Sequence, residues 1–276
     1  MGKLVIMEST DSFRNSTSLF REKERAALKI QFQDVNTPEM IFNATHINVP
    51  IYDGLQSLEL PGFNDGSIFA YEANPNDGLD VVQRKFLTKL RFVLINNHPD
   101  STASRCEEYV RDLAVHLCDC AGLDDGMNLV LLPCNLRLQI GGASFAAIAD
   151  KEGRRGRELA YVIQEEKHRG TSTYLKGDLQ IACAMIAATQ HNYNLFETIY
   201  PQKMLGIKII ADRVYFCAIS PSQAYIDNLL DGLEIHHEVT MFKFPANGFS
   251  LSNPQERAAV LKHMSSLRSE LLSLEV

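Results

Sequence analysis

Residues 158–168 read ELAYVIQEEKH, an apolar run that ends in charged side chains. A short run rich in aromatic and β-branched residues predicts a buried strand. Side chains alternate across a strand, so Glu165 and Lys167 share one face, and Glu166 points the other way. A carboxylate and an ammonium group at the open end of a strand suit phosphate-ester hydrolysis, because the carboxylate can hold Mg²⁺ and the lysine can orient the attacking water. The alternative is a charged strand end that only meets solvent.

The residues just before this strand predict its hairpin partner. The apolar segment 143–149 reads as the partner strand, and a polar turn follows it. With the turn centred between Arg154 and Arg155, Ser144 lies opposite Glu165. Asp150 then sits at the turn, about six residues further along the strand and roughly 20 Å from Glu165.

Two helices are predicted on either side of this hairpin. Residues 103–121 form the first, with Glu107 and Glu108 near its start and Gly122 as its C-terminal stop. Residues 176–192 form the second, and Gln180 begins a face of mostly small residues that can pack closely on a sheet. Further elements are expected at 83–96, 128–132, 136–140, 206–211, 214–219, 223–233, 239–244 and 254–274, the last capped by Asn253 with Pro254 at its first position.

The predicted elements indicate an α/β fold with a central mixed β-sheet flanked by helices. The length of 276 residues suits one large domain with an added layer. Residues 1–84 alternate short apolar runs with turn formers, which predicts an N-terminal β-rich layer of strands and loops. Residues 85–276 form the α/β core, with a C-terminal helical extension.

The order of these elements resembles the PD-(D/E)XK, or restriction-endonuclease-like, nuclease superfamily, whose core is helix, three strands, helix, strand. Residues 104–220 are most similar to a nuclease-like group found in fungal genomes, in which a Glu-x-Lys strand end precedes an alanine-rich helix that opens with glutamine. Here those positions are Glu165, Lys167 and Gln180, followed by Ala182 and Ala184. The resemblance implies a restriction-endonuclease-like core and metal-dependent cleavage of DNA or RNA phosphodiesters with Mg²⁺ or Mn²⁺.

Carried over residue by residue, the resemblance implies that Glu165 and either Glu107 or Glu108 bind the metal. Lys167 would be the catalytic lysine, and Gln180 a helix residue that faces the site. The family also has an acid, usually aspartate, near the start of the first hairpin strand, whereas residues 141–145 read GGASF. Losing a carboxylate ligand cripples a site for a hard cation. Two hypotheses therefore stand: a nuclease with weakened catalysis, and an inactive nuclease fold that serves as a nucleic-acid or protein binding or assembly module.

The net charge of −7 disfavours a protein that coats nucleic acid non-specifically. Binding of DNA or RNA would need a local basic patch, and one candidate surrounds the predicted hairpin. It comprises Arg154, Arg155, Arg157, His168, Arg169 and Lys176. A solvated hairpin tip explains the same charges equally well.

The six cysteines lie mostly in apolar stretches, and a chain of this size needs no disulfide staples. Reduced thiols in a cytoplasmic or nuclear protein are therefore expected. No apolar stretch approaches the ~18 residues of a membrane span. The sequence leaves open whether the chain forms a homo-oligomer.

Two other kinds of site are disfavoured. Zinc binding by His116, Cys118, Cys120 and Cys134 would need four convergent ligands, but Cys118 points away from its neighbours on one predicted helix. Ser144, preceded by Gly142, loosely matches a nucleophile elbow. Candidate acids and bases for it follow at Asp227, Asp231, His236 and His237. The elbow lacks its second glycine, and the segment after Ser144 reads as strand rather than helix.

Overall fold

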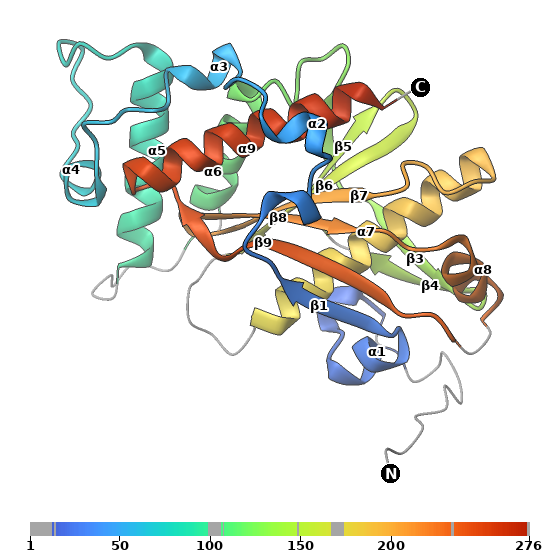
Figure 1. Cartoon of the computed structure of the whole chain (residues 1–276). Helices are drawn as coiled ribbons and strands as arrows, with labels where there is room; N and C mark the ends of the chain where they lie inside the picture. Colours follow the sequence, from blue (N-terminus) through green and yellow to red (C-terminus); the bar gives the residue numbers. More distant parts are fainter. Residues whose placement is uncertain are drawn as a thin grey trace.

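The chain folds around one seven-stranded mixed β-sheet with helices on both faces, as the computed structural model in Figure 1 shows. The described residues are 13, 15–98, 106, 108–147, 149–166, 174–232 and 235–274, without the side chains of residues 165, 166 and 174–176. The expected α/β class is thus confirmed.

The long elements are the following. The strands are β1 (Ile30–Asp34), β2 (Val130–Pro133), β3 (Leu136–Ile140), β4 (Ala143–Ala147), β5 (Lys151–Arg155), β6 (Glu158–Glu166), β7 (Met204–Ile210), β8 (Arg213–Ile219) and β9 (Val239–Ser250). The helices of eight or more residues are α5 (Val81–Asn97), α6 (Glu108–Cys120), α7 (Tyr174–Phe196), α8 (Gln223–Asp231) and α9 (Pro254–Ser273).

The order of strands in the large sheet is β1-β9-β8-β7-β6-β5-β2. Strands β2, β5 and β6 run antiparallel as successive neighbours, and β7 then lies parallel to β6 after the crossover through α7. Strands β8 and β9 continue antiparallel, and β1 closes the edge parallel to β9. Strands β3 and β4 form a separate two-stranded sheet.

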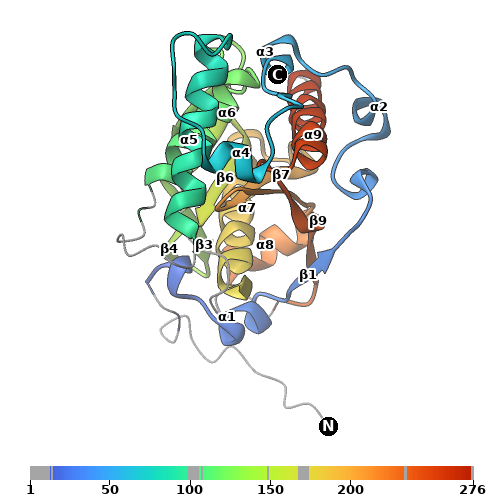
Figure 2. The same cartoon turned by 90° about the vertical axis from the view of Figure 1, so that its left-hand side faces the viewer.

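Each face of the large sheet has its own hydrophobic core. Helices α5, α6 and α9 cover one face, where Ile163, Ile207 and Phe216 point into a shared apolar cluster. Helix α7 covers the other face, and its residues 177–192 are mostly buried between the sheet and β3. Figure 2 shows α5, α6 and α9 on one side of the sheet and α7 on the other. An apolar residue in a central strand is therefore buried whichever way it points, which explains the continuous apolar runs of β7 and β8.

The N-terminal part is helical rather than β-rich. Its described strand is β1, which joins the large sheet, whereas the apolar segments 41–49 and 67–71 contain helical turns and no strand. The short helices of this part are η2 (Thr17–Leu19), α1 (Glu22–Ala27), η3 (Pro38–Met40), α2 (Ala44–Ile47), α3 (Asp53–Gln56) and α4 (Asp65–Phe69). The expectation of strands failed because a short apolar run fits one helical turn as well as a strand.

Helix predictions based on caps and long patterns are confirmed. Helix α9 begins at Pro254, and the side chain of Asn253 accepts hydrogen bonds from two backbone amides of the first turn, as an N-cap should. Helix α7 is longer than expected, and the elements expected at 206–211 and 214–219 are the antiparallel strands β7 and β8.

Candidate functional site

The β5–β6 ribbon has its tight turn at Gly156 and Arg157, two residues later than expected. Arg155 pairs with Glu158 across this turn, and Gly156 adopts a positive φ of 62°, which favours glycine in two-residue hairpin turns. A register shift also occurs in β5 between Gly153 and Arg154. The register of the ribbon follows from this turn and from the shift in β5.

Ser144 is therefore not the residue opposite Glu165, and that prediction is wrong. Ser144 lies in β4 and pairs with Gln139 of β3, in the other sheet. Its hydroxyl accepts hydrogen bonds from Arg137 and Gln139, so a nucleophile elbow gains no support at this position. The error came from treating the polar segment as one long turn, although much of it is the strand β5.

Asp150 lies next to the last described pair of the β5–β6 ribbon, which joins Lys151 and Ile163. It directly precedes β5, at the end of the ribbon away from the turn, and its amide donates to the carbonyl of Ile163 at 2.9 Å. Lys151 pairs with the same Ile163, and the described pairing of β5 with β6 ends there. Glu165 follows Ile163 by two positions in β6. Diagonal neighbours on paired strands are within roughly 8 Å, so Asp150 and Glu165 lie close together rather than about 20 Å apart.

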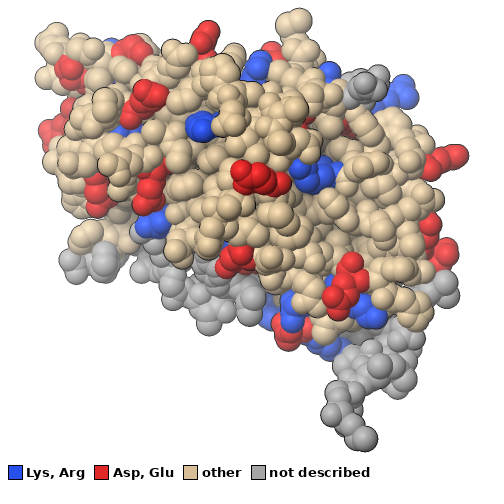
Figure 3. All heavy atoms as spheres, in the orientation of Figure 1, with Lys and Arg blue, Asp and Glu red and all other residues tan. Residues whose placement is uncertain are grey.

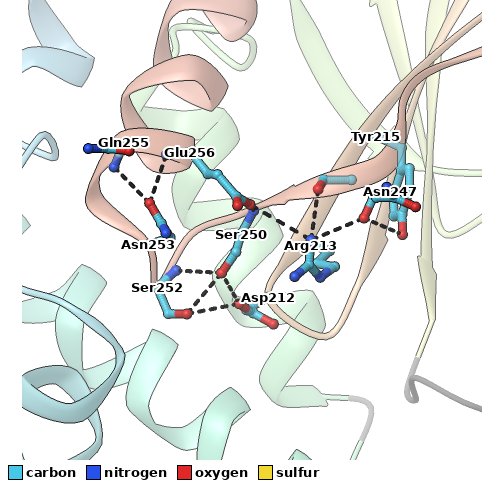
Figure 4. Close-up of polar contacts among 10 residues, drawn as sticks. Asp212, Arg213, Tyr215, Asn247, Ser250, Ser252, Asn253, Gln255 and Glu256 are labelled. Carbon is cyan, nitrogen blue, oxygen red and sulfur yellow. Dashed lines mark hydrogen bonds and ion pairs between the residues drawn. The ribbon is translucent and has the colours of Figure 1, made fainter. Parts of the chain in front are cut away.

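Strand β7 ends at the same edge of the sheet. Glu166 pairs with Ile210, the last residue of β7, and the β7–β8 turn brings in Asp212. The Asp212 carboxylate accepts hydrogen bonds from the hydroxyls of Ser250 at 2.5 Å and Ser252 at 3.2 Å, as Figure 4 shows. Asp212 is thus a third acid at this edge. The two serines that hold it lie in the segment just before α9.

A buried charge cluster lies beneath the first turns of α7, on the opposite face from α6. The Asp178 carboxylate contacts the ammonium groups of Lys208 and Lys243, each at 2.8 Å. Lys243 also contacts Asp34 at 3.2 Å. The backbone of Gln164, next to Glu165 in β6, pairs with Lys208, so this cluster adjoins the edge that carries Asp150.

Burial alone lowers the pKa of a lysine, yet Asp178 and Asp34 raise the pKa of Lys243 above its ordinary value. Lys243 is therefore charged at neutral pH. The cluster holds two lysines and two aspartates, and it fastens α7 to β7, β9 and β1. We refer to Asp178, Lys208, Lys243 and Asp34 as the α7 anchor.

The helix residues expected in the site are only partly placed by the structure. Gln180 is half-buried on α7. Asp178, two positions earlier, has described contacts with the sheet through Lys208 and Lys243. Glu108 is the first residue of α6, whose start was expected at residue 103, and its carboxylate is exposed and pairs with Arg111 at 2.8 Å. Glu107 and Lys167 lie outside the described residues.

Two arginines of the predicted basic patch make internal contacts. Arg154 pairs with the buried Glu152 at 2.7 Å. Arg155 donates to the backbone carbonyls of Leu271 and Leu274 at the end of α9. Both arginines therefore have structural roles. Arg154 neutralises a buried carboxylate, and Arg155 supplies donors to carbonyls at a helix C-terminus, which lack partners within the helix.

Arg157 is the patch residue that lies exposed, at the ribbon turn. His168, Arg169 and the side chain of Lys176 lie outside the described part of the chain. On the face drawn in Figure 3, lysines and arginines are scattered among aspartates and glutamates and form no large continuous patch.

Among the side chains that the structure describes, no three His, Cys, Asp or Glu residues converge as a ready set of metal ligands. The side chain of Glu165 is not among them. The predicted alternative of a zinc site gains no support, since Cys118 is buried and Cys134 lies near the carbonyl of Ala147. His116 and Cys120 lie 3.9 Å apart on α6.

Glu158, at the start of β6, gives the ribbon a pH dependence. Its side chain is almost fully buried, and burial raises its pKa to about 7, although the charge of Arg155 partly offsets this. A carboxyl whose pKa is raised in the folded state favours folding while it is protonated. The free energy of unfolding should therefore fall as the pH rises from about 4.5 to about 7.

Replacing Glu158 with glutamine removes this titration. We expect Glu158→Gln to match the wild type near pH 5 and to exceed it by roughly 1–3 kcal/mol at pH 8, since no charge is then buried. Urea unfolding followed by circular dichroism at several pH values measures the difference. Parallel pH profiles for the two proteins would show that Glu158 does not titrate in this range.

Comparison with known proteins adds no family assignment. No protein-family model matches the chain, and no curated protein does so. Within the described residues, no helix combines the length and the apolar character needed to cross a membrane.

Proposed function

We propose that this protein is a metal-dependent, nuclease-like enzyme that acts on DNA or RNA phosphodiesters at the edge where β6 ends. Its acids would be Asp150 and Glu165, and Lys167 would be its catalytic lysine. In this proposal Asp150, and not Ser144, corresponds to the hairpin aspartate of the family. The weakened catalysis expected from a missing acid is therefore no longer required.

The topology supports this proposal. Helix α6 is followed by the antiparallel strands β2, β5 and β6, then by α7, then by β7 parallel to β6. This is the order helix, three strands, helix, strand that the resemblance implies, with the β3–β4 hairpin inserted after the first strand. Fold order alone does not establish chemistry, so the proposal depends on the residues at the edge.

The observation that carries the proposal is the position of Asp150. Its amide donates to the carbonyl of Ile163, two residues before Glu165, and this places an aspartate beside the end of β6. Aspartate and glutamate oxygens are the donors that Mg²⁺ and Mn²⁺ prefer, so the residue types fit a hard cation. Such an ion, when bound, would polarise the phosphate and lower the pKa of an attacking water.

The protein's own residues would supply positioning and charge. Asp150 and Glu165 would hold the cation at the strand ends, and the Lys167 ammonium would offset the negative charge that develops on the phosphate oxygens. The α7 anchor would fix the helix that follows Lys167 on the sheet, close to the reacting groups.

A cleavage assay tests the proposal. The full chain is incubated with single- and double-stranded DNA and RNA in Mg²⁺, in Mn²⁺ and in EDTA, beside Lys167→Ala. We expect cleavage that needs the metal and that falls by about 100-fold or more in Lys167→Ala. Binding without cleavage would contradict the enzyme and favour the alternative of an inactive binding or assembly module. Metal-independent hydrolysis of a simple ester would instead point to Ser144.

A further inference from the structure

A cavity of about 450 Å³ lies between α5 and α6, on the opposite side of the sheet from the α7 anchor. Its polar lining includes Arg84, Lys85, Thr88 and Lys89 from α5 and Asp112 from α6, and the rings of Phe92 and Tyr109 also line it. We call this cavity the α5–α6 groove. It is separate from the strand ends that carry Asp150 and Asp212.

Helix α5 is strongly basic in a chain that is acidic as a whole. Between Val81 and Asn97 it carries two lysines and two arginines and no aspartate or glutamate, whereas the net charge of the chain is −7. Lys85 and Lys89 are one helical turn apart, and Phe92 follows three residues later, so the three share one face of the helix. A positive stripe of this kind attracts a polyanion.

The cations of the groove are unequally neutralised. Arg84 pairs with Asp77 at 3.0 Å, and Lys89 pairs with Asp112 at 3.2 Å. Lys85 is exposed and has no ion-pair partner among the residues that the structure describes. Lys85 therefore offers a full positive charge to a ligand without breaking an internal contact.

The two aromatic residues that line the groove are exposed. Phe92 and Tyr109 are 41% and 39% exposed, and their rings stack with centroids 5.4 Å apart and planes inclined by 19°. A stacked aromatic pair that faces solvent presents a flat apolar surface beside the cations. Unpaired nucleic-acid bases stack on such surfaces, whereas the bases of a duplex are already stacked on each other.

From this combination we infer that the α5–α6 groove binds single-stranded nucleic acid, with phosphates along Lys85 and Lys89 and a base on the Phe92–Tyr109 pair. The inference rests on the proposed function for the role of the strand as substrate, while binding itself can be measured without cleavage. It also gives nucleic acid a binding surface that does not depend on the arginines of the ribbon, two of which make internal contacts.

The test is fluorescence anisotropy of the full chain with a fluorescein-labelled single strand, in EDTA to prevent metal-dependent cleavage, beside a duplex of the same sequence. We expect the single strand to bind more tightly than the duplex. Lys85→Glu should weaken binding about 10-fold or more and flatten its dependence on salt. Tyr109→Ala should weaken it roughly 10-fold, while Tyr109→Phe keeps the ring and the affinity.

The matched control is Lys262→Glu, which reverses an exposed charge on α9 and should leave binding nearly unchanged. Equal binding of the duplex, or full affinity in Lys85→Glu and Tyr109→Ala, would overturn the inference. So would binding of an acidic poly-glutamate peptide that the single strand cannot displace. Cleavage that is unchanged in Lys85→Glu and Tyr109→Ala would contradict this inference but not the proposed enzyme. Single-strand binding in the groove without any cleavage would contradict only the proposed enzyme.

Discussion

Asp178→Asn is expected to lower the free energy of unfolding by about 3–5 kcal/mol, because it breaks a buried ion cluster by removing one partner. Asp178 is 3% exposed, and its two oxygens each contact a lysine ammonium at 2.8 Å. Lys208 is fully buried and Lys243 nearly so. Asparagine keeps the shape of the side chain but leaves Lys208 without that carboxylate, and Lys243 with Asp34.

Urea unfolding of the full chain measures this loss, and two further variants make the result specific. Adding Lys208→Met to Asp178→Asn should recover part of the stability, since it removes a buried cation that has lost the Asp178 carboxylate. Glu22→Gln breaks the exposed pair with Arg25 instead and should cost less than about 1 kcal/mol. A loss of less than about 1 kcal/mol in Asp178→Asn would mean that the α7 anchor contributes little to holding α7 on the sheet.

Asp150→Asn is expected to reduce metal-dependent cleavage by about 100-fold or more while leaving the fold intact. A preorganised charged group at a reacting phosphate typically contributes a factor of this size. Asp150 is half-buried, and its backbone hydrogen bond to Ile163 does not depend on its side chain. The strand end should therefore keep its shape in the variant.

Ser144→Ala is the matched control for this prediction, since Ser144 lies in the two-stranded sheet rather than across from Glu165. Initial cleavage rates in Mg²⁺ and Mn²⁺, with circular dichroism as a check on folding, give the comparison. Full activity in Asp150→Asn together with a dead Lys167→Ala would place the metal-binding acid elsewhere.

The parts of the fold that local signals determine could be predicted from the sequence. Asn253 with Pro254 marks the start of α9, and the long apolar patterns of α6 and α7 mark helices. The β7–β8 hairpin also follows from its strands and turn. Each of these features depends on neighbouring residues, so no knowledge of the tertiary structure is needed.

The register of the β5–β6 ribbon was the feature that sequence analysis missed, and it determines which residues lie near Glu165. One glycine, Gly156, sets the turn, and moving the turn by two residues changes which residue faces Glu165. The signal was present, because Gly-x is a common two-residue hairpin turn. With the turn at Gly156, Asp150 rather than Ser144 would have been the candidate acid.

The α7 anchor could be recognised only in part from the sequence. Lys208 interrupts the apolar strand MLGIKII, and Lys243 lies within MFKFP, which marks both as unusual positions for a cation. That a single carboxylate on α7 serves both lysines depends on the crossover between β6 and β7. Contacts between residues so distant in sequence carry no local pattern.

The most direct test of the site is Mn²⁺ binding, followed by the electron paramagnetic resonance signal of the free ion as it is titrated into the full chain. If Asp150 and Glu165 share one cation, the wild type and Ser144→Ala should take up Mn²⁺ with equal affinity. Asp150→Asn should bind it about 10-fold or more weakly, since an oxygen ligand is lost. Undiminished Mn²⁺ affinity in Asp150→Asn would contradict a metal site at this strand edge.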